Sequence, residues 1–316
     1  MEYRRLGKTG IKVSRLCFGS LTISPLQANL SAADGARLIE EAMDRGINFL
    51  DTAELYDNYM HIREAMRGKP RDKLVIATKT YAYTREMAEK SLKKAMNEIK
   101  TDHIDIFLLH EQESELTLKG HSEAVEYLIN ARDKGYISAF GVSTHHIECV
   151  KAAVKLDEIE VIHPIVNIRG LGIADGGVEE MLGAVERAGD CGRGIYAMKP
   201  LGGGNINRDF RRCLDFVLKI PHIDSIAVGM QCIEELEANL AFFENRPVDK
   251  KTADMLAGRK RRLIIEPWCE GCGSCIKACS QGALHIRDGK AAVRQDMCIL
   301  CGYCAAKCKN FYIKVI

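Results

Sequence analysis

The sequence predicts an α/β protein in which a (β/α)8 barrel is followed by a small, cysteine-rich α+β domain. Three observations support this prediction. The 316 residues exceed the roughly 250 that eight strand–helix units need. Short apolar runs alternate with amphipathic helical stretches from Leu16 to Phe243. Eight of the 13 cysteines fall between Cys269 and Cys308, which indicates a compact metal-binding unit.

The barrel is predicted from strands that are each followed by a helix, because this order gives a parallel sheet and eight such units close most simply into a barrel. The candidate strands are Leu16–Gly19, Ile47–Leu50, Leu74–Ala77, Ile104–Leu109, Ile137–Val142, Val161–Val166, Gly194–Met198 and Ser225–Val228. The candidate helices are Ala32–Arg45, Arg85–Ile99, Leu118–Lys134, Ile147–Lys155, Val178–Ala188, Asp209–Lys219 and Ile233–Phe243. An open doubly wound sheet is the rival, but no Gly-x-Gly-x-x-Gly follows the first strand.

Two short segments before the first strand, Tyr3–Leu6 and Ile11–Ser14, predict a hairpin that closes one end of the barrel. At the other end of the chain, the pattern changes after Pro247. We therefore predict a barrel over residues 1–247, a linker or exposed helix over 248–263, and a second domain over 264–316. The basic run Arg259–Arg262 in the linker is interpreted as solvated surface.

Composition narrows the function classes. A net charge of +2 argues against nucleic acid or an anionic membrane as a partner. No apolar run approaches the roughly 20 residues that span a bilayer. The charged residues of Met1–Lys8 are not followed by the apolar stretch of a signal peptide. We expect a cytoplasmic protein, in which dense cysteines bind metal rather than form disulfides.

Four polar residues stand at or just after strand ends, where barrels of this class carry their chemistry. Asp51, Lys79 and His110 end the second, third and fourth strands, and Tyr56 lies in the loop after Asp51. A carbonyl that accepts hydride needs a proton at its oxygen, and a tyrosine with a pKa near ~10 gives one up reluctantly. A nearby ammonium favours phenolate character, an imidazole polarises the carbonyl, and a carboxylate holds the ammonium.

These four residues resemble the tetrad of the aldo-keto reductases, with the first two in the segment Asp51-Thr52-Ala53-Glu54-Leu55-Tyr56 and the others at Lys79 and His110. The resemblance to that family covers roughly residues 1–245. The resemblance implies that Tyr56 is the general acid, that Lys79 lowers its pKa, that Asp51 pairs with Lys79, and that His110 orients the carbonyl. It also implies a barrel that binds NAD(H) or NADP(H) without a Rossmann motif.

The resemblance further implies a set of nicotinamide-cofactor contacts: Ser20, Ser143, Asn167, Lys199, Leu201, Gly229 and Asn239. Two positions depart from the family pattern, with Thr144 in place of an Asn and His163 in place of a Gln. Between Gly229 and Asn239 the chain has glutamates but no Lys or Arg to meet a 2′-phosphate. The sequence therefore predicts a preference for NADH over NADPH.

The clustered cysteines form two copies of one spacing, C-x2-C-x2-C-x3-C, 29 positions apart. Tetrahedral zinc sites also use C-x2-C, but the tandem four-cysteine register favours iron–sulfur clusters. The register resembles that of bacterial ferredoxins, in which the fourth cysteine binds the other cluster, although Ser280 and Lys309 replace the usual proline. The resemblance implies two 4Fe-4S clusters in a ferredoxin-like domain, one held by Cys269, Cys272, Cys275 and Cys308 and the other by Cys298, Cys301, Cys304 and Cys279.

Together these features predict a nicotinamide-dependent oxidoreductase that acts on a small carbonyl compound or alcohol, with the clusters linked to electron transfer. One alternative is an electron-transfer or docking protein whose barrel is a scaffold, and another is that the clusters are purely structural. Nicotinamide passes two electrons as hydride and a cubane passes one, so direct exchange calls for a flavin or a redox partner protein. The sequence contains no flavin signal.

Overall fold

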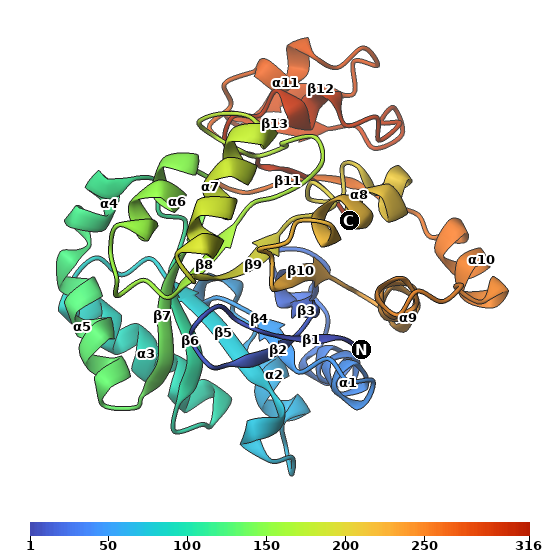
Figure 1. Ribbon diagram of the computed structural model, residues 1–316. Helices are drawn as coiled ribbons and strands as arrows, with labels where there is room; N and C mark the ends of the chain where they lie inside the picture. Colours follow the sequence, from blue (N-terminus) through green and yellow to red (C-terminus); the bar gives the residue numbers. More distant parts are fainter.

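The computed structural model describes residues 1–316 and confirms the predicted fold class. Eight parallel strands close into a barrel in the order β10-β3-β4-β5-β6-β7-β8-β9 (Figure 1). They are β3 (Leu16–Gly19), β4 (Phe49–Asp51), β5 (Val75–Thr80), β6 (Ile104–Leu109), β7 (Ile137–Thr144), β8 (Val161–Pro164), β9 (Gly194–Met198) and β10 (Ser225–Gly229). The first and last strands pair directly, with Ile226 opposite Leu16, so the sheet has no free edge.

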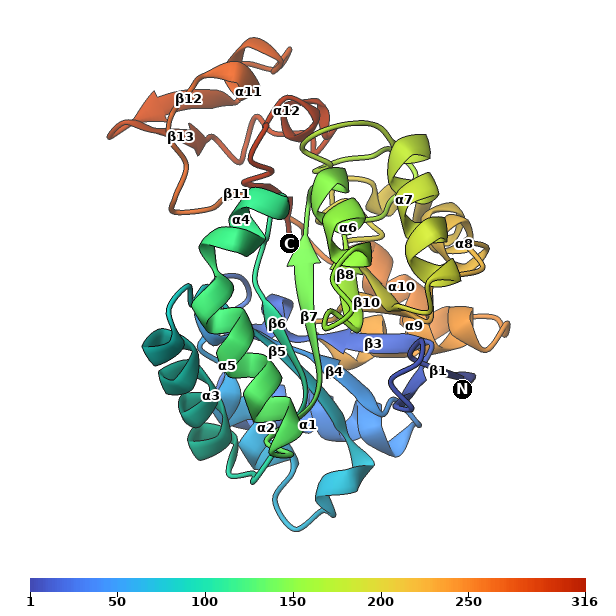
Figure 2. The ribbon, with the colours of Figure 1, turned by 60° about the vertical axis from the view of Figure 1, so that its left-hand side comes forward.

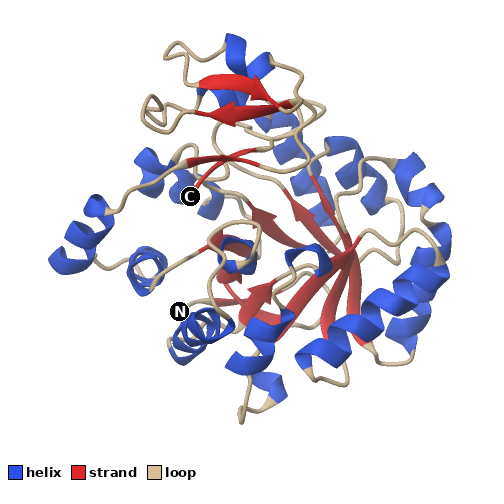
Figure 3. Ribbon diagram, turned by 180° about the vertical axis from the view of Figure 1, so that it is seen from behind, coloured by secondary structure: helices blue, strands red, loops and turns tan.

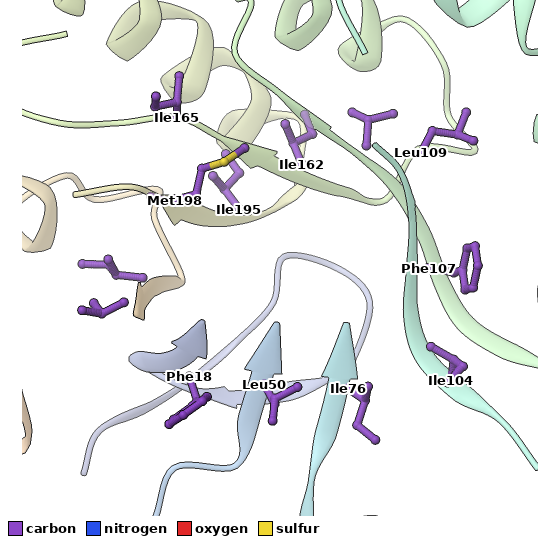
Figure 4. Close-up of a cluster of buried hydrophobic side chains, with 14 of the residues drawn as sticks. Phe18, Leu50, Ile76, Ile104, Phe107, Leu109, Ile162, Ile165, Ile195 and Met198 are labelled. Atoms are coloured by element: carbon purple, nitrogen blue, oxygen red, sulfur yellow. The ribbon is translucent and has the colours of Figure 1, made fainter. Parts of the chain in front are cut away.

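The helices surround the barrel because each buries one apolar face against the strands. They are α1 (Ala32–Asp44), α2 (Tyr59–Ala65), α3 (Arg85–Ile99), α4 (Glu115–Gly120), α5 (Ser122–Asp133), α6 (Ile147–Val154), α7 (Val178–Asp190), α8 (Phe210–Leu218) and α9 (Ile233–Phe243). The largest buried cluster lies between the two layers and includes outward-facing strand residues such as Phe18, Leu50 and Ile76 (Figure 4). None of the helices combines the length and apolar character that a bilayer crossing requires.

The predicted helix over Leu118–Lys134 is wrong in one respect, because the structure divides it. Helix α4 ends at Gly120, where His121 Nδ1 lies 2.7 Å from the carbonyl oxygen of Thr117, and α5 starts at Ser122. The short helix α2 was not predicted, since its seven residues are too few to show a helical period.

The amino end of the barrel is closed by the predicted hairpin, β1 (Tyr3–Arg5) and β2 (Lys12–Ser14). Leu6 and Val13 pack into the interior cluster together with inward-facing strand residues such as Phe49 and Tyr196. Since this end is plugged, the opposite end, where the strands finish, is the one left for a site.

The remaining chain forms helix α10 (Lys250–Gly258) and a small module over the carboxyl ends of the strands (Figures 2 and 3). The module contains β11 (Leu263–Ile265), α11 (Ser274–Lys277), β12 (Leu284–Arg287), β13 (Lys290–Val293), α12 (Tyr303–Ala306) and β14 (Ile313–Val315). Strand β11 pairs with β14, and β12 pairs with β13 through a two-residue turn at Asp288-Gly289. Both turn residues have positive φ, as a tight hairpin of this kind requires.

Candidate functional site

Strand periodicity gathers the polar residues at the carboxyl end of the barrel. Alternate side chains of a strand point inward, so Asp51 shares the inner face with Phe49, and Lys79 shares it with Val75 and Ala77. His110 follows the same alternation directly after β6. These side chains are almost fully buried where the strands open into a cavity.

Asp51 and Lys79 form a buried ion pair that other groups complete. Lys79 Nζ donates to Asp51 Oδ2 at 2.8 Å and to the carbonyl oxygen of Thr52 at 2.7 Å. Tyr196 donates its hydroxyl to Asp51 Oδ1 at 2.9 Å, and His163 Nε2 lies 3.6 Å from the same oxygen. Burial alone would raise the pKa of Asp51, but Lys79, His163 and the Tyr196 hydroxyl outweigh it and hold the pKa below its ordinary value.

Tyr56 and His110 lie beside this pair. Tyr56 ends the short 3-10 helix η2 (Glu54–Tyr56), and its ring meets that of His110 edge-on, with centroids 5.9 Å apart. Lys79 Nζ lies 5.0 Å from the centroid of the Tyr56 ring. The Nδ1 atom of His110 is buried without a hydrogen-bond partner. The site therefore holds a hydroxyl and an imidazole next to a charge-balanced lysine.

Burial sets the protonation of these two groups. Burial, followed by the carboxylates of Asp51 and Glu111, raises the pKa of Tyr56 well above its ordinary value, whereas the resemblance implied that Lys79 lowers it. Burial also lowers the pKa of His110 to about 3. At neutral pH the phenol is thus protonated and the imidazole is neutral, so each can donate a hydrogen bond without carrying charge.

A cavity of about 1160 Å³ opens beside these residues. Asp51, Tyr56 and His163 line its inner end. From there it passes the loop after β9 and reaches the start of α9 and helix α10. A cavity of this size accommodates an extended ligand such as a dinucleotide together with a small substrate.

The seven candidate cofactor contacts divide into two groups. Lys199, Leu201, Gly229 and Asn239 line the cavity. The Oδ1 atom of Asn239 is buried and unpaired, so the structure leaves it free to bind a ligand.

Ser20, Ser143 and Asn167 do not line the cavity. Ser143 Oγ accepts from the backbone N–H of Glu111 at 2.9 Å, and the Asn167 amide bonds to the loop that ends at Leu171. Ser20 is fully buried, and its Oγ has no partner. In this conformation Ser143 and Asn167 fix the loops around the site.

Several site residues were not predicted from the sequence. Tyr196 completes the Asp51 network, although its inward position on β9 follows from the same alternation that places Asp51. Tyr81 stacks on His110 with centroids 4.5 Å apart and donates its hydroxyl to Glu111 at 2.6 Å. Nothing in the local sequence signals this arrangement, because the partners come from separate strands.

The interpretation of the basic run as solvated surface is only partly correct. Lys260 and Arg262 are exposed. Arg259 Nη1 and Arg261 Nη2 each lie 3.2 Å from Glu235 Oε1, and both arginines line the far end of the cavity. The linker therefore brings two arginines to the start of α9, where the charged residues of the local sequence are all glutamates.

The two cysteine motifs fold alike. Gly273 and Gly302 stand 29 positions apart, both have positive φ, and they begin the short helices α11 and α12. Gly271 and Leu300 repeat the same backbone feature two residues earlier. The sequence repeat is thus also a structural repeat of the backbone around the cysteines.

Neighbouring thiols lie close together in the module. Burial, together with the neighbouring thiols of Cys308, Cys269 and Cys272, raises the pKa of Cys275. A second small cavity is lined by Cys279, Cys298, Cys301 and Cys304. No three His, Cys, Asp or Glu side chains approach closely enough to hold one metal ion.

Comparison with known proteins gives two matching family models. The model described as the aldo/keto reductase family matches residues 15–212, and the model described as a 4Fe-4S dicluster domain matches residues 262–309. The first match covers the strands that carry all four polar residues, and the second covers all eight clustered cysteines.

Relatives among characterised and uncharacterised proteins are distant. An uncharacterized oxidoreductase of Bacillus subtilis, YrpG, is 27% identical over 65% of this chain and 68% of its own length. An L-galactose dehydrogenase of Arabidopsis thaliana is 22% identical over 84% of this chain and 95% of its own length. A solved structure titled as a putative aldo-keto reductase from Pseudomona aeruginosa superposes with a TM-score of 0.66 at 24% identity, covering 77% of this chain and 95% of that one.

Proposed function

The chain belongs to the aldo/keto reductase family, and from this premise we propose that it interconverts a small carbonyl compound and an alcohol with a nicotinamide cofactor. The observation that carries the proposal is the buried Asp51–Lys79 pair with Tyr56 and His110 beside it, at the inner end of a cavity large enough for a dinucleotide. We further propose a cytoplasmic location, since the clustered thiols suit a reducing compartment.

The residues divide the chemistry between them. The nicotinamide cofactor supplies hydride to the carbonyl carbon, and the carbonyl oxygen must then gain a proton. Tyr56 donates that proton, and the neutral His110 donates a hydrogen bond to the same oxygen. Asp51 and Lys79 form a fixed ion pair beside the phenol and hold it in place. The module covers the strand ends, which limits the access of water to the site.

A consequence for pH dependence follows from the two pKa shifts. Reduction needs Tyr56 protonated and His110 neutral. The pKa of Tyr56 is raised, so its phenol stays protonated at alkaline pH. The pKa of His110 is lowered to about 3, so its imidazole is neutral above pH 3. We expect the rate constant of the bound complex to stay nearly flat between about pH 5 and pH 9. Single-turnover kinetics at saturating substrate would measure it; a tenfold fall centred near pH 6.5 would contradict the assignment of His110.

We propose that the module holds two 4Fe-4S clusters, with the first ligated by Cys269, Cys272, Cys275 and Cys308 and the second by the other four thiols. The support is the grouping of the thiols and the match to a dicluster domain. Such clusters supply one-electron transfer. A flavin or a redox partner protein would then link them to hydride chemistry, and the structure contains no groove assigned to either.

The charge at the far end of the cavity bears on cofactor choice. The expected preference for NADH rested on glutamates near α9 without a nearby cation. The structure pairs Glu235 with Arg259 and Arg261, so its negative charge is balanced. The preference for NADH stays a prediction, and Glu235 is the residue that controls it.

Replacing Glu235 tests this control. Glu235→Gln removes one negative charge and frees the two arginines, while the amide oxygen can still accept from the backbone N–H of Gln231. We expect NADPH binding to strengthen relative to NADH by about fivefold, or ~1 kcal/mol. Fluorescence titration at fixed ionic strength gives the ratio, and Glu234→Gln on the same helix is the control. An unchanged ratio would place the 2′-phosphate elsewhere.

The function as a whole is tested by turnover. Anaerobically purified protein is screened with NADH and NADPH against aldehydes, ketones and sugars, and bound cofactors are identified after extraction. Oxidation of the reduced nicotinamide that depends on a carbonyl compound is the expected result. Bound clusters with no turnover of any carbonyl would favour the alternative, in which the barrel is a scaffold for an electron-transfer protein.

A further inference from the structure

The cysteine-rich module forms part of the wall of the barrel cavity. Its last strand, β14, is anchored to the loop after β9: the backbone N–H of Val315 donates to the carbonyl oxygen of Gly203 at 3.0 Å, and Asn205 Nδ2 donates to that of Ile313 at 2.9 Å. Lys314 and Val315 line the same cavity as Tyr56. Any ligand in the cavity is therefore in reach of the module.

Phe311 fixes this contact. It is 1% exposed and belongs to the core cluster of the barrel rather than to that of the module. Its φ is +55°, a left-handed conformation that is rare for an aromatic residue, at the position where the first cysteine motif has Gly282. Left-handed backbone at a bulky side chain persists only where the surroundings impose it. The ring is held in place between the two domains.

Two lysine ammonium groups converge on this ring, one from each domain. Lys199 Nζ lies 5.5 Å from the ring centroid and Lys314 Nζ lies 3.6 Å from it. Lys199 bonds to His145 Nε2 at 2.7 Å, and Lys314 donates to the carbonyl oxygen of Phe311. Neither ammonium group has a carboxylate within 4.0 Å, and Lys314 is only 3% exposed.

The partner that the ammonium groups of Lys199 and Lys314 lack is an anion. Two buried like charges without a counter-ion are costly, and burial lowers the pKa of both lysines, that of Lys314 to about 7 with a further contribution from Lys199. The carboxylates that face them, Glu111 and Glu266, already accept from the Tyr81 hydroxyl and from Trp268 Nε1. The cavity thus holds two lysines that no carboxylate of the protein pairs with, and an anion bound between them would stabilise their charged forms.

We propose that Lys199 and Lys314 together bind an oxyanion, a carboxylate or phosphate group of the small molecule in the cavity, so that the cysteine-rich module contributes directly to ligand binding. The proposal deepens the proposed function and rests on the same cavity. The oxyanion belongs either to the carbonyl substrate or to the pyrophosphate of the dinucleotide. Both present oxygen atoms that accept charge-assisted hydrogen bonds from ammonium groups.

The test uses the cluster-loaded protein and calorimetric titration under anaerobic conditions with two probes, sodium oxalate and inorganic pyrophosphate. We expect wild-type protein to bind at least one of them, and Lys314→Gln and Lys199→Gln each to weaken that binding about tenfold or more. Lys314→Arg keeps the charge and should retain most of the affinity. Lys260→Gln, at an exposed lysine of the linker, is the matched control and should bind like wild type.

Saturation with NAD+ separates the two sources of the oxyanion. If oxalate still binds to the NAD+-saturated protein, the lysines bind an anionic group of the substrate. If pyrophosphate no longer binds, the cofactor itself occupies the lysines. Either result supports an oxyanion site. Iron content is measured for every variant to confirm that the module is intact. Failure of both probes to bind, or wild-type affinity in both glutamine variants at full iron content, would overturn the proposal.

Binding of the probes does not require turnover, so this result is independent of the reductase proposal. If the wild-type protein binds a probe through both lysines and reduces no carbonyl compound, the reductase proposal fails while the oxyanion site stands.

Discussion

Replacement of Tyr56 by Phe should reduce carbonyl reduction by a factor of ~10²–10⁴ while nicotinamide binding stays close to that of wild type. The variant removes a single hydroxyl that lies beside His110 and Lys79 and leaves the ring in place. Hydride transfer then leaves a negative oxygen without its proton donor. Single-turnover reduction, followed by the absorbance of the reduced nicotinamide, measures the loss, and a fluorescence titration measures cofactor affinity.

The matched control is Tyr59→Phe. Tyr59 is also buried, and its hydroxyl lies 2.7 Å from Thr78 Oγ1, but it does not line the cavity. Its loss should cost about 1 kcal/mol of the free energy of unfolding and leave the rate unchanged. If Tyr56→Phe turns over a substrate at the wild-type rate, Tyr56 is not the proton donor and the assignment of the site is wrong.

The iron content of the protein is the second large effect. Anaerobically purified protein should be brown and carry about eight irons and about eight acid-labile sulfides per chain, as two cubanes require. The eight cysteines of the two motifs and the match to a 4Fe-4S dicluster domain support this number. Chemical analysis and the visible absorbance spectrum measure it. Stoichiometric zinc with no labile sulfide would falsify the prediction.

Single cysteine variants test how the ligands are shared. Cys308 belongs to the second motif by sequence, yet it neighbours Cys275 and is assigned to the first cluster. Cys308→Ser should therefore alter the same paramagnetic signal as Cys269→Ser and leave the signal that Cys298→Ser alters. Cys191→Ser, at an exposed thiol of the barrel, should change neither signal. If Cys308→Ser instead reproduced the effect of Cys298→Ser, each motif would bind its own cluster.

Patterns of short period predicted most of the fold. Eight strands, the closing hairpin and the inward direction of Asp51, Lys79 and His110 all follow from alternation along strands, which is a local property. The repeated cysteine register predicted the 4Fe-4S dicluster domain for the same reason, while the assignment of individual thiols to two clusters stays a prediction. The break between α4 and α5 was not predicted, although Gly120, His121 and Ser122 interrupt the apolar pattern there.

Contacts between distant segments could not be predicted. Tyr196 reaches Asp51 across 145 residues, and its hydroxyl has no local pattern that indicates the partner. Lys314 and Phe311 belong to a ferredoxin-type repeat by sequence, and only the docking of the module turns them toward the barrel. Arg259 and Arg261 likewise belong to a stretch whose composition is that of a solvated linker. For Tyr196 the information lies in the packing of separate barrel strands, and for the other four residues it lies in the packing of the linker and module on the barrel. One sequence displays neither.

The three glycines after β9, Gly202-Gly203-Gly204, differ in what surrounds them. A Cβ at Gly204 would lie 2.0 Å from the carbonyl oxygen of Val315, and one at Gly203 would lie 2.8 Å from Lys314. A Cβ at Gly202 would instead meet Leu171 and Ile206 of the barrel, so only Gly203 and Gly204 lie against the module. In a library of variants, a side chain at Gly204 should therefore loosen the module, whereas one at Gly202 should disturb the barrel loop.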